Sequence, residues 1–60
     1  MNKYEKAIKK EEETLRRLYK ASNDMYYLAQ YQEILTLEVQ LDMISYGELD
    51  KKVEELKEVK

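Results

Sequence analysis

The segment from Met25 to Tyr46 constrains the fold of this 60-residue chain more than any other feature of the sequence. Fourteen of its twenty-two residues are apolar, and it contains no lysine or arginine. The chain around it is rich in charge, since 40% of all residues are Asp, Glu, Lys or Arg. A chain of this length builds one small core at most. We therefore expect a single domain over residues 1–60 that folds around this segment.

The composition leaves few ways to stabilise so small a domain. The sequence contains no cysteine and no histidine, which removes disulfides, thiolate zinc sites and the commonest metal ligand. The usual nucleophile–base pairs of hydrolases are missing for the same reason. We therefore expect a protein that is not an enzyme, holds no cofactor or metal, and gains stability by association.

Little in the sequence interrupts a helix, because proline is absent and Gly47 is the one glycine. Asn2 and Glu5 have the spacing of a capping box, so we expect a first helix over Lys3–Ala21. Its apolar seam would follow the heptad spacing of a coiled coil. The seam has these members: Tyr4, Ile8, Glu11, Leu15 and Leu18.

Residues Leu35–Met43 alternate between apolar and polar, which is typical of a half-buried strand. The chain has no second run of this kind with which a strand could pair, so we favour a helix. Cap-preferring residues at 22–24 predict a turn before it. We expect this second helix over Asp24–Tyr46 and a third over Glu48–Val59. The predicted fold class is all-α, with two to three helices.

The boundary before the third helix has two explanations. Gly47 can adopt the left-handed conformation that ends a helix. Alternatively, Ser45 can cap the following helix, with Glu48 as the other half of a capping box. Both explanations place a third helix after this point.

On a helix, the apolar residues of the central segment fall into two stripes on opposite sides. A surface helix of a monomer needs only one such stripe, and the flanking segments offer few aliphatic side chains to cover both. We therefore predict a homodimeric helical bundle or obligate binding to another protein, with a closed three-helix monomer as the alternative. The expected interface and core residues are Ile34, Leu37, Leu41, Ile44, Leu35, Val39 and Met43.

A tyrosine cluster and two acidic residues indicate the surface that we expect to bind a partner. Tyrosine combines an apolar ring with a polar hydroxyl and is enriched in interfaces, although rim packing of the bundle is the alternative. Glu38 and Asp42, four residues apart, are suited to bind a partner's Arg or Lys, or else form a solvated acidic lane. The expected partner-binding residues are Tyr26, Tyr27, Tyr31, Glu38 and Asp42.

The segment Glu38-Val39-Gln40-Leu41-Asp42 resembles the S-Q-E-L-D signature of small helical-hairpin phosphatases that act on sporulation response regulators. Leu41 and Asp42 match in place, and the first three positions differ. A phosphatase-like regulator, as this resemblance implies, is therefore one alternative function.

The main prediction is a small module that binds, and regulates or inhibits, another protein through a helical surface. A homo-oligomerisation module is an alternative. Weak nucleic-acid binding is another, although glutamates are interleaved with the basic residues of the first helix and the net charge is −2. No apolar run approaches the length of a membrane span and the start lacks a signal peptide's apolar core. We therefore expect a cytoplasmic protein with no membrane contact.

Overall fold

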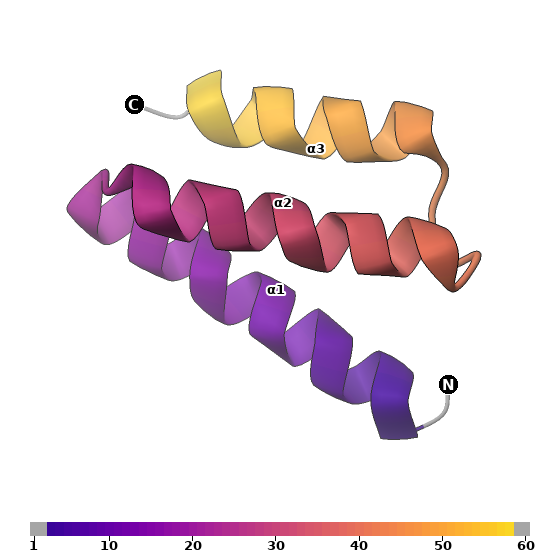
Figure 1. Cartoon of the computed structure of the whole chain (residues 1–60). Helices are drawn as coiled ribbons and strands as arrows, with labels where there is room; N and C mark the ends of the chain where they lie inside the picture. The colour runs from indigo at the N-terminus through magenta and orange to yellow at the C-terminus, as the bar shows by residue number, and fades with distance from the viewer. Residues whose placement is uncertain (1–2, 59–60) are drawn as a thin grey trace.

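The computed structural model describes residues 3–58, and its regular structure over this range consists of three helices without a strand (Figure 1). These are α1 (Lys3–Ser22), α2 (Met25–Gln40) and α3 (Tyr46–Glu58). Helix α2 lies in the middle, with α1 packed along one side and α3 along the other. The predicted all-α class is confirmed. The expected cap at Asn2 and helix end at Val59 lie outside the described residues.

The turn between α1 and α2 lies where the cap-preferring residues predict it. Asn23 adopts a left-handed conformation with φ of 60°, and its backbone N–H donates to the Tyr19 carbonyl at 2.7 Å. Asparagine tolerates this conformation better than most residues do. Asp24 then caps α2, because its carboxylate accepts a hydrogen bond from the Tyr26 N–H at 3.0 Å.

Helix α2 ends at Gln40, so the predicted end at Tyr46 is wrong. The N–H of Met43 donates to the Glu38 carbonyl at 2.8 Å, and the N–H of Asp42 donates to the Val39 carbonyl at 3.0 Å. This pair of bonds is a Schellman motif. Asp42 is the left-handed residue, with φ of 58°, at the position where glycine is usual. The sequence therefore carries no glycine signal for this helix end.

Helix α3 is capped by Ser45, which confirms the second explanation of this boundary. The Ser45 hydroxyl oxygen accepts a hydrogen bond from the Glu48 N–H at 3.2 Å and donates to the Glu48 carboxylate at 3.5 Å. Gly47 lies in the first turn of α3 and has a negative φ. Its freedom to adopt a left-handed conformation is therefore not used.

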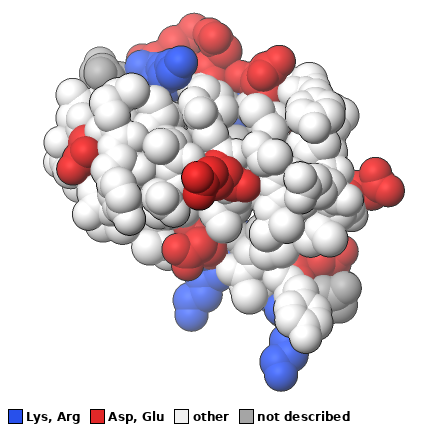
Figure 2. All heavy atoms as spheres, in the orientation of Figure 1, with Lys and Arg blue, Asp and Glu red and all other residues white. Residues whose placement is uncertain are grey.

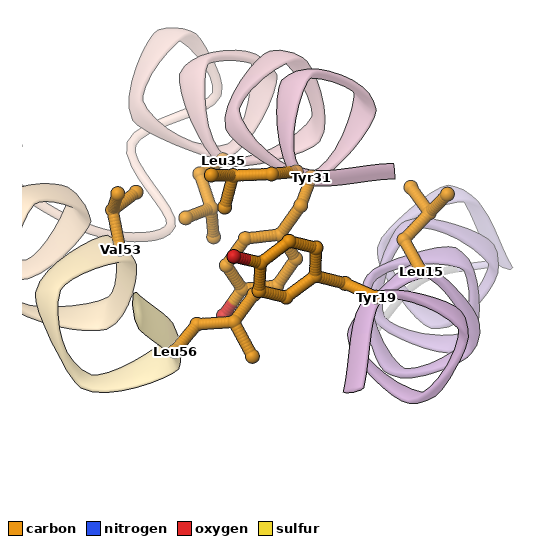
Figure 3. Packing of buried hydrophobic residues seen from close by; sticks show 7 residues of the cluster. Leu15, Tyr19, Tyr31, Leu35, Val53 and Leu56 are labelled. Carbon is orange, nitrogen blue, oxygen red and sulfur yellow. The ribbon is translucent and has the colours of Figure 1, made fainter. Parts of the chain in front are cut away.

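All three helices contribute to one core, and Figure 3 shows its side chains meeting between them. Buried side chains of α1 and α3 join those of α2 in a single cluster. The buried apolar residues are Leu15, Tyr19, Leu28, Tyr31, Leu35, Val53 and Leu56.

The seam predicted for α1 is correct at Ile8 and Leu15 and wrong elsewhere. Tyr4 is 77% exposed and Leu18 is 39% exposed, and Glu11 faces solvent. The buried members are instead Glu12 and Tyr19, each one residue further along the chain. This shift rotates the buried face of α1 by about 100° at these positions, and it carries a glutamate into the interior.

Candidate functional site

Two glutamates from neighbouring helices meet inside the molecule. Glu12 of α1 is 5% exposed, and Glu38 of α2 is completely buried. The buried residues of α2 are Leu28, Tyr31, Leu35 and Glu38, and they follow one another at intervals of three, four and three residues on one face of the helix. Each glutamate therefore occupies a core position of its helix. An acidic pair in such a position requires compensation, because burying a carboxylate is costly.

Two lysines supply part of this compensation. The Lys52 ammonium of α3 binds Glu12 Oε2 at 2.9 Å, and the Lys9 ammonium of α1 lies 3.4 Å from Glu38 Oε1. Three buried carboxylate oxygens, Glu12 Oε1 and both oxygens of Glu38, have no hydrogen-bond partner that meets the geometric requirements, although Lys9 lies at ion-pair distance from one of them. Unsatisfied buried acceptors of this kind favour the uptake of a proton.

A proton shared between the two carboxyl groups resolves this conflict. Burial raises the pKa of Glu38 to about 7, and the hydrogen bond with Glu12 and the negative charge of Glu12 add to this effect. Burial alone would raise the pKa of Glu12 as well, but hydrogen bonds from Glu38 and Lys52 outweigh it and lower that pKa. Of the two carboxyl groups, Glu38 is therefore the one that holds a proton more readily, and Glu12 is the one that ionises first.

Tyr31 lies next to this pair and is 1% exposed. Burial raises the pKa of its hydroxyl, and the negative charge of Glu12 raises it further. The phenol consequently stays protonated and remains a hydrogen-bond donor. A substrate cannot reach the glutamates without opening the helices, so this buried cluster is suited to sensing pH within the fold.

Burial of Tyr31 and Glu38 contradicts their expected place on a solvated partner-binding surface. Their polarity suggested exposure, but cations from α1 and α3 compensate for their burial. Lys52 of the third helix is half-buried against Glu12. Glu12, Lys9 and Lys52 form a site that the sequence analysis did not identify.

The other expected partner-binding residues are accessible but do not form one patch. Tyr26 is 63% exposed in the first turn of α2, and its ring meets the half-buried Tyr27 ring edge-on at 5.5 Å. Asp42 is exposed beyond the opposite end of this helix. A role in binding a partner stays a prediction for these three residues.

An apolar groove opens on the surface where the start of α1 diverges from the end of α2 (Figure 1). We call it the α1–α2 groove; it has a volume of about 450 Å³ and is lined by Tyr4, Glu5, Ile8, Leu37 and Leu41. Of its lining residues, Tyr4 is 77% exposed, Leu41 50% and Leu37 38%. The groove therefore leaves large apolar side chains in contact with water.

The expected interface residues divide between the core and this groove. Leu37 and Leu41 line the groove, and Leu35 is completely buried. The rest are half-buried: Ile34, Val39, Met43 and Ile44. Ile34 and Ile44 pack against the core of the same molecule.

No known protein family, curated protein or solved structure matches this chain. Among residues 3–58, no group of three or more acidic side chains is placed to hold a metal ion. No helix in this part of the chain is long and apolar enough to cross a membrane. A function must therefore be argued from the buried cluster, the α1–α2 groove and the charges around them.

Proposed function

We propose that this chain is a protein-interaction module rather than an enzyme, and that the α1–α2 groove is its binding surface. The exposure of Tyr4, Leu37 and Leu41 is the observation that carries this proposal. Full burial of one large apolar side chain stabilises a protein by roughly 1.5–3 kcal/mol. Covering the exposed parts of these three residues would therefore favour binding, against the entropic cost of association.

The shape of the groove favours a helix as the bound element. Two helices that diverge form an apolar channel, and amphipathic helices commonly bind in such channels through side chains spaced three or four residues apart. Leu37 and Leu41 of this chain have that spacing themselves. The first occupant that we propose is therefore α2 of a second copy, which makes the module a homodimer.

Charge distribution favours one orientation of such a dimer. The face of the molecule shown in Figure 2 is mostly uncharged, with acidic side chains near its middle and most other charges around its edge. Helix α1 has seven basic and four acidic residues, whereas α3 has three basic and five acidic residues. A twofold axis parallel to α2 would place the basic helix of one copy on the same side as the acidic helix of its partner.

Sedimentation equilibrium over a range of concentrations tests this proposal. We expect the wild-type chain to dimerise, and the double variant Leu37→Gln/Leu41→Gln to stay monomeric with an unchanged helical spectrum. Met25→Gln is the matched control, because Met25 is 62% exposed but lies outside the groove. A monomeric wild type at all concentrations would exclude the second copy as the occupant. If the control weakened dimerisation as much as the double variant does, the groove would be excluded as the dimer interface.

A further inference from the structure

A second cleft, distinct from the α1–α2 groove, lies where all three helices approach one another. Its volume is about 170 Å³. Helix α1 contributes Arg16 and Lys20, α2 contributes Tyr31, and α3 contributes Lys52, Glu55 and Leu56. Three of these six residues are cationic, and one is acidic.

The Tyr31 side chain forms the floor of this cleft. It is 1% exposed, and Figure 3 shows its ring extending from α2 toward Leu56 of α3. The negative charge of Glu12 acts on its hydroxyl, and the positive charges of Lys52 and Arg16 oppose it. Within residues 3–58, no hydrogen bond joins this hydroxyl to another residue. Tyr31 lines the cleft together with three cationic side chains, so its hydroxyl can donate to a ligand that binds there.

Two of the three cations are available for a ligand. Lys52 is held by Glu12 at 2.9 Å. Arg16 and Lys20 make no ion pair within the part of the chain that the structure describes. Lys20 is exposed and Arg16 is half-buried, so both can reorient toward a bound anion. Glu55 is the one acidic side chain that lines the cleft.

We propose that this cleft binds a phosphate-type oxyanion, with the Tyr31 hydroxyl as a donor and Arg16 and Lys20 as the charged partners. The cleft volume of about 170 Å³ is several times the roughly 30 Å³ that one water molecule occupies in the liquid, so a small polyatomic anion has room to enter. Its donors come from three helices and so approach from several directions. Such an arrangement suits a tetrahedral group better than a planar carboxylate, and charge-assisted hydrogen bonds of this type are strong.

Titration followed by amide NMR shifts tests the site directly. The probes are inorganic phosphate and O-phosphoserine at constant ionic strength, with chloride as the reference anion. We expect saturable shifts at residues around the cleft with both phosphates and none with chloride. Tighter binding of O-phosphoserine would identify a phosphorylated ligand as the source of the group. If inorganic phosphate bound as tightly as O-phosphoserine, or more tightly, free phosphate would be identified as the ligand.

Matched variants separate this site from general charge effects. Tyr31→Phe keeps the ring and removes the donor, and Arg16→Gln removes one cation; each should weaken phosphate binding by about threefold to tenfold. Arg17→Gln makes the same charge change at an exposed position outside the cleft and should leave the affinity unchanged. Equal weakening by Arg17→Gln and Arg16→Gln would overturn the proposal, as would full affinity in Tyr31→Phe.

A substitution of an acidic residue of the cleft tests the proposal independently if Tyr31→Phe fails to fold. Glu55 is exposed, so Glu55→Gln should leave the fold intact while removing the charge that opposes the anion. We expect phosphate affinity to rise by about threefold. Glu54→Gln, one residue away and outside the cleft, should have no such effect. An unchanged or lower affinity in Glu55→Gln would refute the site.

Discussion

Replacing Glu38 with glutamine should remove a pH dependence from the stability of this protein. The folded-state pKa of Glu38 is raised from 4.5 to about 7. A carboxyl group whose pKa is higher in the folded state stabilises the fold fully at a pH below its unfolded-state pKa. This contribution is lost as the pH rises through its folded-state pKa. The wild-type chain should therefore lose stability between about pH 4.5 and pH 7.

The size of this loss follows from the shift. Each pKa unit corresponds to 1.36 kcal/mol, so a rise from 4.5 to about 7 amounts to about 3 kcal/mol. A 60-residue domain has a total stability of about 3–9 kcal/mol. The contribution of Glu12 to stability changes with pH in the opposite direction, because a group with a lowered pKa loses its stabilising effect as the pH falls. The wild type should consequently be most stable at mildly acidic pH.

Urea denaturation followed by far-ultraviolet circular dichroism measures this effect at about pH 5.5 and about pH 8. In Glu38→Gln, the amide donates to Glu12 at every pH, so the variant should match the wild type at the lower pH and exceed it at the higher pH. Glu33→Gln removes the same charge from an exposed position of α2 and should keep the wild-type profile. A wild-type stability that stays level or rises between these pH values would refute the shared proton, and so would an unchanged slope in Glu38→Gln.

Three further substitutions test the helix ends and the core by the same denaturation assay. Asp42→Gly should stabilise the protein by about 0.5–1 kcal/mol, because glycine adopts the left-handed conformation at φ of 58° without steric cost; a loss of stability would contradict this reading. Asp24→Ala should cost about 1 kcal/mol, because the N–H of Tyr26 loses its acceptor, and an unchanged midpoint would exclude that capping role. Leu35→Ala, at a completely buried position, should cost about 2–5 kcal/mol and leave much of the chain unfolded, whereas a cooperative transition near that of the wild type would refute its place in the core.

Local chemistry explains why the three helices and the first turn could be predicted from the sequence. The absence of proline and the cap-preferring residues at 22–24 act within a few positions along the chain. The end of α2 could not be predicted in this way. Asp42 takes a role that usually belongs to glycine, and the half-buried Met43 and Ile44 that follow it favour this turn through contacts made only in the folded molecule.

The buried cluster escaped prediction because its members are compensated from distant parts of the sequence. Glu12 depends on Lys52, which lies forty residues away. A signal was nevertheless present: Tyr31 and Glu38 continue the heptad spacing of Leu28 and Leu35 on one face of α2. Their spacing predicts burial, whereas their polarity predicts exposure, and the structure follows the spacing.

The weaker anchoring of α3 sets the order in which the molecule should come apart. This helix contributes two buried apolar residues, Val53 and Leu56, as many as α1, but it packs less extensively against α2 than α1 does. Detachment of α3 alone would also withdraw Lys52 from Glu12. Water would then reach Glu38, and because burial is the main cause of its raised pKa, the remaining hairpin would release the proton more readily. Detachment of the C-terminal helix and proton release are therefore linked events, each of which promotes the other.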